Sequence, residues 1–204
     1  MSAADTRREI LEVALELFSR SGFDAVSIRD ICARVGIKES TVYYHFENKR
    51  AILEELRLRF EQTAGDLMRT LDAALREPLP REGVSMSAVS DIFFERYLMD
   101  DFCNGFMRLM DRERGQDADM RRLYEQWMFD EPLGYQASVF GALMRAGVLP
   151  QGDCAHLALK YYAPIFLICQ RHLMGGPPGE AEKARFREAV GLHIGRFFRE
   201  SIGG

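Results

Sequence analysis

Hydrophobic positions recur every three or four residues along most of the chain, and no segment alternates with a period of two. This spacing is typical of amphipathic helices and does not fit half-buried β-strands. The first such segment runs from about residue 5 to 21 and ends at Gly22, and its apolar face holds Ile10, Leu11, Ala14, Leu15, Leu17 and Phe18. The pattern therefore predicts an all-α fold that begins with a helix of about five turns.

The segment from Ser27 to Phe46 predicts two short helices joined by a tight turn. Ser27 can cap the first helix, and Asp30 stands three residues later, where a carboxylate completes a capping box. Gly36 can supply the positive φ that a sharp turn needs. The second helix, from about residue 38 to 46, then turns four side chains largely outward: Lys38, Thr41, Tyr44 and His45. Spacing alone fits a helix-turn-helix and an ordinary hairpin of core helices equally well.

A long helix is expected after Asn48, which is a suitable cap, up to about residue 76, where Pro78 and Pro80 follow. At 1.5 Å per residue such a helix spans roughly 40 Å. Beyond it the pattern predicts helices near residues 84–100, 102–114, 117–146, 153–174 and 179–201, separated by Gly and Pro. No flexible linker interrupts this organisation.

Charge and composition bear on the expected partners and the cellular location of the protein. The chain has 204 residues, 47% of them hydrophobic, and a net charge of −4. Residues 1–60 contain ten Lys and Arg and ten Asp and Glu, so any affinity for nucleic acid must come from the placement of the cations. The N-terminus is polar, and the apolar run Tyr161–Cys169 is too short to cross a bilayer. We expect a cytoplasmic protein with no membrane partner.

The candidate chemistry does not favour an enzyme. The four cysteines, at positions 32, 103, 154 and 169, have no CxxC spacing and are expected to be buried thiols. Cys169 and His172 alone are insufficient for a zinc site, so no metal and no cofactor is expected. The sequence contains no paired catalytic carboxylates in helical register and no nucleophile motif.

The run from Gly36 to Phe46, GIKESTVYYHF, followed by Asn48 and Lys49, closely resembles the DNA-binding signature of the TetR family of bacterial transcriptional regulators. The resemblance covers roughly the first 55 residues. It departs from the family pattern at Lys38, where Ser or Thr is common, and at Glu39, which would repel phosphate. The resemblance implies a homodimer that binds double-stranded operator DNA, with these candidate contacts: Arg29, Lys38, Thr41, Tyr43, Tyr44, His45 and Lys49.

The same resemblance implies a helix-turn-helix domain at residues 1–47 and a helical ligand-binding and dimerisation domain at 48–204. Aromatic and methionine residues are abundant in the second domain, where a pocket for a small-molecule inducer would draw on Phe94, Tyr97, Phe106, Met110, Trp127, Tyr161 and Phe166. Core packing also explains any one of them. The last two helices would pair with a second subunit through Tyr162, Val190, Ile194 and Phe197.

The function implied is that of a ligand-responsive regulator, by family default a repressor that a hydrophobic or aromatic molecule releases from its operator. The alternative is a dimeric DNA-binding protein without a ligand, whose C-terminal domain only dimerises or binds another protein.

Overall fold

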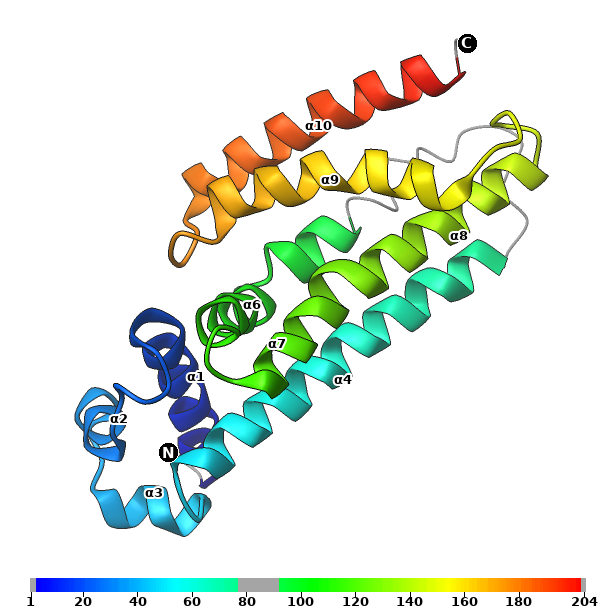
Figure 1. Ribbon diagram of the computed structural model, residues 1–204. Helices are drawn as coiled ribbons and strands as arrows, with labels where there is room; N and C mark the ends of the chain where they lie inside the picture. Colours follow the sequence, from blue (N-terminus) through cyan, green and yellow to red (C-terminus); the bar gives the residue numbers. More distant parts are fainter. Residues whose placement is uncertain (1–2, 77–91, 203–204) are drawn as a thin grey trace. The chain divides into compact units, whose positions relative to one another are not determined.

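The computed structural model describes residues 3–76 and 92–202, and all of its regular elements are helical (Figure 1). In chain order these are α1 (Ala3–Ser21), α2 (Ile28–Val35), α3 (Glu39–His45), α4 (Lys49–Arg76), η1 (Phe94–Leu98), α6 (Asp101–Glu113), α7 (Ala118–Glu125), η2 (Gln126–Asp130), α8 (Glu131–Arg145), α9 (Cys154–Leu173) and α10 (Glu180–Ile202). The all-α prediction is confirmed. Pro78, Pro80 and residues 84–91 of the helix expected at 84–100 lie outside the described residues.

The described chain forms two compact units, and neither is continuous in sequence. Unit 1 consists of residues 1–64 and 101–124, and unit 2 of residues 65–100 and 125–204. Helix α4 has no break and contributes residues to both. The division expected from the sequence, 1–47 and 48–204, follows function rather than compactness and stays a prediction.

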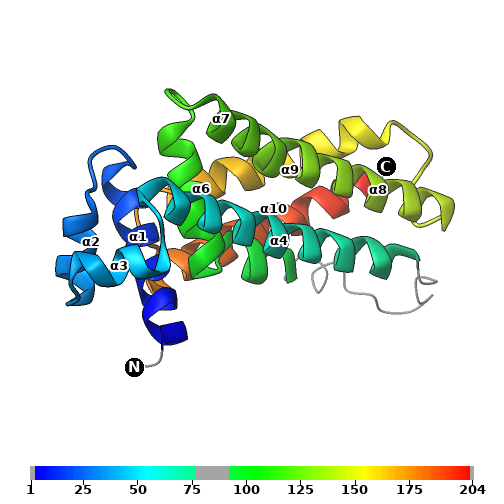
Figure 2. The same cartoon turned by 90° about the horizontal axis from the view of Figure 1, so that it is seen from below.

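In unit 1, α1 packs against α2, α3 and α6, and Figure 2 shows α2 and α3 side by side next to α1. Its core contains Ile10, Phe18, Ile31, Val42 and Phe46, so the expected three-helix core is present. Phe60 of α4 stacks on Phe106 of α6, with 4.7 Å between ring centroids. Helices α4 and α6 therefore extend the hydrophobic core beyond the first three helices.

In unit 2, α9 packs against α8 and α10. Phe140 of α8, Tyr161 of α9 and Phe197 of α10 meet in one aromatic cluster, with ring centroids 5.2–5.7 Å apart. Arg187 on α10 donates two hydrogen bonds, of 2.7 and 2.9 Å, to the Glu95 carboxylate on η1. The Arg187 guanidinium holds the pKa of Glu95 below its ordinary value, first through hydrogen bonding. Phe94 of η1 also packs edge-on against Phe186 of α10, with 5.7 Å between ring centroids, so the four elements share one core.

The helix expected at 117–146 changes hydrogen-bond register in its middle. Residues Gln126–Asp130 form the π-helical turn η2, in which the Glu131 N–H donates to the Gln126 carbonyl. Pro132 follows and has no N–H, so it cannot serve the Trp127 carbonyl in π register or the Met128 carbonyl in α register. Two tyrosines supply the missing donors: Tyr97 Oη lies 2.7 Å from the Trp127 oxygen and Tyr162 Oη lies 3.0 Å from the Met128 oxygen. The proline is thus accommodated by hydroxyls from η1 and α9.

A search of the described helices found none that is both long enough and apolar enough to span a membrane.

Candidate functional site

The helix-turn-helix is held in shape by local hydrogen bonds. The Ser27 hydroxyl accepts the Asp30 N–H at 3.2 Å, and the Asp30 carboxylate accepts the Ser27 N–H at 2.8 Å. This confirms the predicted capping box, and the hydrogen bonds from Ser27 lower the pKa of Asp30. Gly36 has φ 79°, the left-handed conformation expected at the turn. The chain therefore enters α3 at a defined angle to α2.

Helix α3 buries one side and exposes the other. Val42 is completely buried in unit 1, whereas 52% of Tyr43 and 78% of Tyr44 are exposed. Lys38 is exposed, Thr41 and His45 are half-buried, and the His45 ring lies edge-on to Tyr44 with centroids 5.0 Å apart. Two adjacent tyrosines give this exposed side of α3 both aromatic rings and hydroxyl groups. The predicted residues on α3 do share an outward face.

The two unusual positions at the start of α3 behave differently. Lys38 is the N-cap and makes no capping hydrogen bond through its side chain, as its chemistry requires. Glu39 pairs with Arg29 of α2, with 3.0 Å between Nε and the carboxylate oxygen. Both partners are well exposed, so the pair adds little stability. It does, however, neutralise the carboxylate that would otherwise repel a phosphate, and it occupies Arg29, which we predicted as a DNA contact.

Arg7 of α1 fixes the end of α3, a role that the sequence did not reveal. Its guanidinium donates to the His45 carbonyl at 3.3 Å, lies 4.5 Å from the centroid of the Phe46 ring and forms an ion pair with Glu55. Arg7 therefore joins α1, the C-terminus of α3 and α4. Its partners are 38 and 48 residues away, which explains why spacing could not identify them.

The ammonium group of Lys49 is used in hydrogen bonds within the domain itself. Its Nζ donates to the Phe23 and Val26 carbonyls, both at 2.7 Å, and lies 4.2 Å from the centroid of the Phe23 ring. Two of its three N–H groups are therefore committed to the loop between α1 and α2. We infer that Lys49 positions this loop, so the predicted phosphate contact has at most one donor left.

The same loop is tied to the corner between α6 and α7, also within unit 1. The Glu113 carboxylate accepts the Phe23 N–H at 3.0 Å, and Arg50 lies 3.6 Å from Asp117. These residues border a polar depression of about 360 Å³. Asp117 also accepts the N–H groups of Asp119 and Met120 and so caps α7. A displacement of this corner would therefore move Phe23 and Arg50, which flank the helix-turn-helix in the sequence.

The predicted ligand-binding residues divide between the two units. Phe106 and Met110 are buried in unit 1, whereas the other five belong to unit 2: Phe94, Tyr97, Trp127, Tyr161 and Phe166. All five except Phe166 are buried, and the Phe166 ring lies 5.0 Å from that of Phe129. Tyr97 is committed to the Trp127 carbonyl. Their role as an inducer site stays a prediction.

Tyr135 of α8, which the sequence reasoning did not select, has a buried hydroxyl with no hydrogen-bond partner among the described residues. Burial raises its pKa to about 12, with the nearby Asp72 carboxylate adding to the shift. An unsatisfied hydroxyl in a core usually has a specific reason, such as a water or a ligand.

The predicted dimer residues pack within their own chain. Tyr162, Val190 and Phe197 are buried, and Ile194 is half-buried. The apolar residues exposed on the same two helices are instead Leu159 and Leu167 of α9 and Leu192 of α10, with 53%, 69% and 61% of their surface accessible. The predicted dimer residues thus lie mainly on the inner face of α9 and α10, and the part of these helices in a dimer stays a prediction.

The cysteine and metal expectations can be compared with the described part of the chain. Cys32, Cys103 and Cys169 are buried free thiols and Cys154 is half-buried. Desolvation raises the pKa of Cys169 to about 12, so this thiol stays protonated at neutral pH. A search of residues 3–76 and 92–202 finds no cluster of three His, Cys, Asp or Glu side chains suited to a metal ion.

Sequence comparison identifies the N-terminal region. The model for bacterial regulatory proteins of the tetR family matches residues 10–56. The transcriptional regulator UidR of Escherichia coli K12 is 38% identical over 82 residues, which cover 40% of this chain and 37% of UidR. The match to AcrR of Shigella flexneri, 35% identical, covers 32% of this chain and 30% of that protein. The similarity thus spans about a third of the length of these relatives.

Structural comparison extends the likeness of fold to the whole chain. A TetR-family regulator from Mesorhizobium loti superposes with a TM-score of 0.66 at 22% identity, covering 98% of both chains. The complex of SmeT with triclosan gives a TM-score of 0.64 at 18% identity, covering 94% of this chain and 91% of that one. These neighbours share the fold, and the sequence match lies on the helix-turn-helix described above. The N-terminal region of this chain therefore matches the TetR family of bacterial transcriptional regulators, and the chain as a whole shares the fold of solved regulators of that family.

Proposed function

We propose that this protein is a ligand-responsive repressor that binds operator DNA as a homodimer and is released by a small hydrophobic or aromatic molecule. The observation that carries the DNA-binding part is the outward face of α3. Lys38, Tyr43 and Tyr44 project from a helix whose entry is held by the Ser27 capping box and whose exit is held by Arg7. A second helix presented this rigidly fits the DNA major groove.

The charge distribution indicates that few cations of the helix-turn-helix are available to contact DNA phosphates. With Arg29 paired to Glu39 and Lys49 bonded to the α1–α2 loop, Lys38 is the principal candidate for a phosphate or guanine contact. The tyrosine hydroxyls and rings add groove and sugar contacts. A single copy of this surface has little charge, so useful affinity requires two copies on one DNA site.

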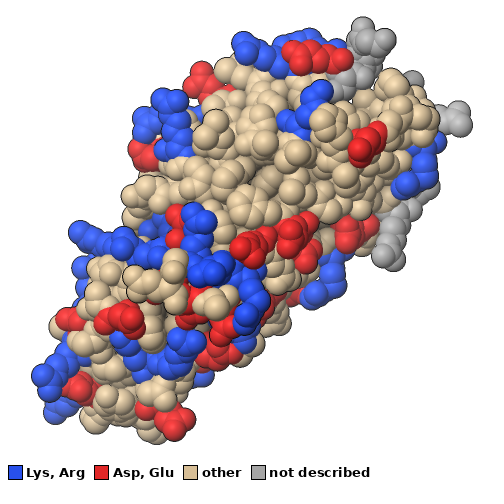
Figure 3. Space-filling view, in the orientation of Figure 1, with Lys and Arg blue, Asp and Glu red and all other residues tan. Residues whose placement is uncertain are grey.

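Dimerisation through α9 and α10 would supply the second copy. Figure 3 shows a broad surface with few charges over these helices. The exposed large apolar residues of α9 and α10 in the described chain are Leu159, Leu167 and Leu192. Exposed leucines of this number on two adjacent helices are typical of a protein-binding face. We propose them, in place of the buried Val190 and Phe197, as the contacts of the dimer.

The inducer site is proposed in the aromatic core of unit 2. Trp127, Tyr97 and Tyr161 are buried there, and Tyr135 of the same unit, which Tyr161 influences, adds a buried hydroxyl that has no partner among the described residues. Apolar walls with an available polar group are typical of a ligand site. The structural neighbour SmeT is seen with triclosan, an apolar aromatic compound. The alternative, a dimeric DNA-binding protein without a ligand, predicts that no small molecule changes DNA affinity.

Selection from random duplexes tests the proposal. The protein should enrich an inverted repeat whose half-sites lie about one helical turn, roughly 10 base pairs, apart. Tyr44→Ala should weaken binding and change the preferred bases, whereas Leu58→Ala, an exposed apolar residue of α4, serves as the matched control and should change neither. Enrichment of no sequence, or an equal effect of both variants, would contradict the DNA-binding role of α3.

A further inference from the structure

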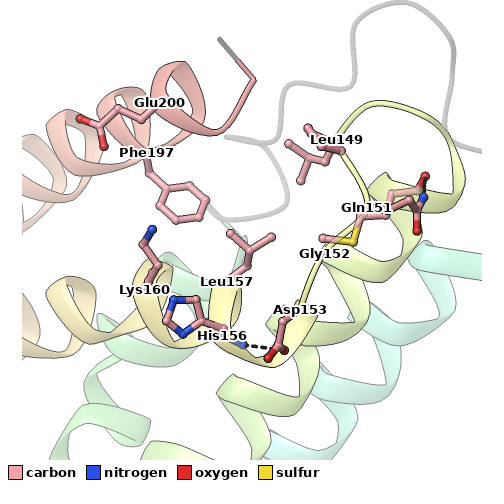
Figure 4. Close-up of a pocket in the computed structure, with 11 residues that line it drawn as sticks. Leu149, Gln151, Gly152, Asp153, His156, Leu157, Lys160, Phe197 and Glu200 are labelled. Carbon is pink, nitrogen blue, oxygen red and sulfur yellow. Dashed lines mark hydrogen bonds between the residues drawn. The ribbon is translucent and has the colours of Figure 1, made fainter. Parts of the chain in front are cut away.

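Unit 2 has a cavity of about 340 Å³. None of the predicted ligand-binding residues lines it, but the predicted dimer residue Phe197 does. It lies between the end of α8, the loop that follows and the facing sides of α9 and α10 (Figure 4). Met144, Leu149, Leu157 and Phe197 form its apolar walls. A volume above 300 Å³ with mainly apolar walls is typical of a small-molecule site.

The polar groups at this cavity favour an anion. His156 and Lys160 stand four residues apart on α9 and therefore share one face of the helix. Neither side chain has an ion pair or hydrogen bond with another residue in the described ranges. The Asp153 carboxylate is already used, because it accepts the N–H groups of Ala155 and His156 at 2.9 and 3.0 Å and caps α9.

Glu200 is the remaining carboxylate at the cavity. In Figure 4 its side chain runs along α10, away from the Phe197 ring, which points to the opposite wall. The Lys160 ammonium is directed toward the Phe197 side of the cavity. The Lys160 ammonium thus lies beside the apolar walls, whereas the Glu200 carboxylate points away from the Phe197 ring.

We propose that this cavity binds a small apolar carboxylate, with the apolar body between Leu149, Leu157 and Phe197 and the carboxylate at Lys160 and His156. At about 30 Å³ for each water-sized group, the volume corresponds to about eleven non-hydrogen atoms. A phenyl ring with a three-carbon acid chain, 3-phenylpropanoate, has that size. The proposal concerns binding at this cavity only and does not depend on the inducer site in the aromatic core.

Methyl NMR of the full chain labelled at methionine provides a local readout. The protein has ten methionines, and Met144 lines the cavity, where its methyl group lies close to Gly152. Titration with 3-phenylpropanoate should move the Met144 resonance, assigned through Met144→Leu, in a saturable manner. Because charge-assisted hydrogen bonds are the strong ones, Lys160→Gln should weaken binding about tenfold.

Three controls separate the possible explanations. Lys183→Gln removes a cation of α10 that does not line the cavity and should leave the affinity unchanged. The neutral amide of the same acid should bind about tenfold more weakly than the acid. Leu157→Trp should fill the cavity and abolish the shift while circular dichroism shows that the helices are intact.

Other outcomes would overturn the proposal. A Met144 resonance that does not move up to the solubility of the probe would show that the cavity is not a site for it. Equal binding of the acid and the amide, or an unchanged affinity in Lys160→Gln, would remove carboxylate recognition. Preference for 3-phenylpropylamine would make the cavity a cation site at Glu200 instead.

Discussion

Replacing Tyr97 or Tyr162 by Phe tests how the chain accommodates Pro132. Each substitution removes one hydroxyl and leaves the ring in place, so the carbonyl of Trp127 or Met128 loses the donor that Pro132 cannot provide. Both tyrosines are buried in unit 2, where water cannot replace the lost hydrogen bond without entering the core. An unsatisfied buried acceptor costs about 1–3 kcal/mol. We expect a loss of about 1–2 kcal/mol for each variant.

Tyr97→Phe should show the larger effect, since its hydrogen bond is 2.7 Å long and that of Tyr162 is 3.0 Å. For a chain of this size 1 kcal/mol lowers the melting temperature by about 2–4 °C. Urea unfolding followed by circular dichroism measures the free energy, and calorimetry measures the melting temperature. The loss of stability in the double variant should differ from the sum of the two single losses, because the two carbonyls belong to one turn.

Tyr135→Phe is the matched control. Its hydroxyl is buried in the same unit and has no hydrogen-bond partner in the described chain, so its removal should be neutral or stabilise by up to about 1 kcal/mol. If all three variants lose the same stability, the cost belongs to the core in general. If Tyr97→Phe and Tyr162→Phe are neutral, the explanation of the π-helical turn is wrong.

Three further results are expected. Lys49→Ala should destabilise the protein by about 1–2 kcal/mol, because the Phe23 and Val26 carbonyls lose their donor; the salt dependence of DNA binding should stay unchanged, whereas a slope lower by about 0.9 would restore the phosphate contact. Leu167→Arg should yield folded monomers in analytical ultracentrifugation, whereas Val190→Arg should lower the melting temperature, and a dimeric Leu167→Arg would exclude this face. The raised pKa of Tyr135 means that the folded state keeps a proton which the unfolded state loses, so stability should fall between pH 10 and about 12, and Tyr135→Phe should reduce that fall in urea titrations.

Much of the local structure followed from the sequence because its causes are local. The Ser27–Asp30 capping box, the left-handed Gly36, the Asn48 cap and the ends of α2 and α3 each depend on residues within four positions of one another. The helical pattern also predicted the all-α fold, and the signature from Gly36 to Lys49 was long enough to show the resemblance to the TetR family. The outward direction of Tyr44 could be predicted once Val42 and Phe46, four residues apart, were assigned to the buried side of the helix.

The identity of partners across the fold was decided by the tertiary structure. Nothing near Lys49 indicated that the Phe23 and Val26 carbonyls would accept its hydrogen bonds, and nothing near Arg7 indicated its hydrogen bond to the His45 carbonyl. The apolar stripes on α9 and α10 predicted burial, but periodicity cannot say whether the covering surface belongs to the same chain or to a second copy. Here Val190 and Phe197 are covered by their own chain, and the exposed leucines lie on another face.

The proline at position 132 shows the division most clearly. The sequence showed that a helix through this point must lose a donor, since Pro132 has no N–H. Only the packed structure shows that the hydroxyls of Tyr97 and Tyr162 supply the missing donors. These tyrosines lie 30 and 34 positions in the sequence from the carbonyls to which they donate. Local rules state which backbone groups need a partner, and the fold determines which distant side chains are close enough to provide one.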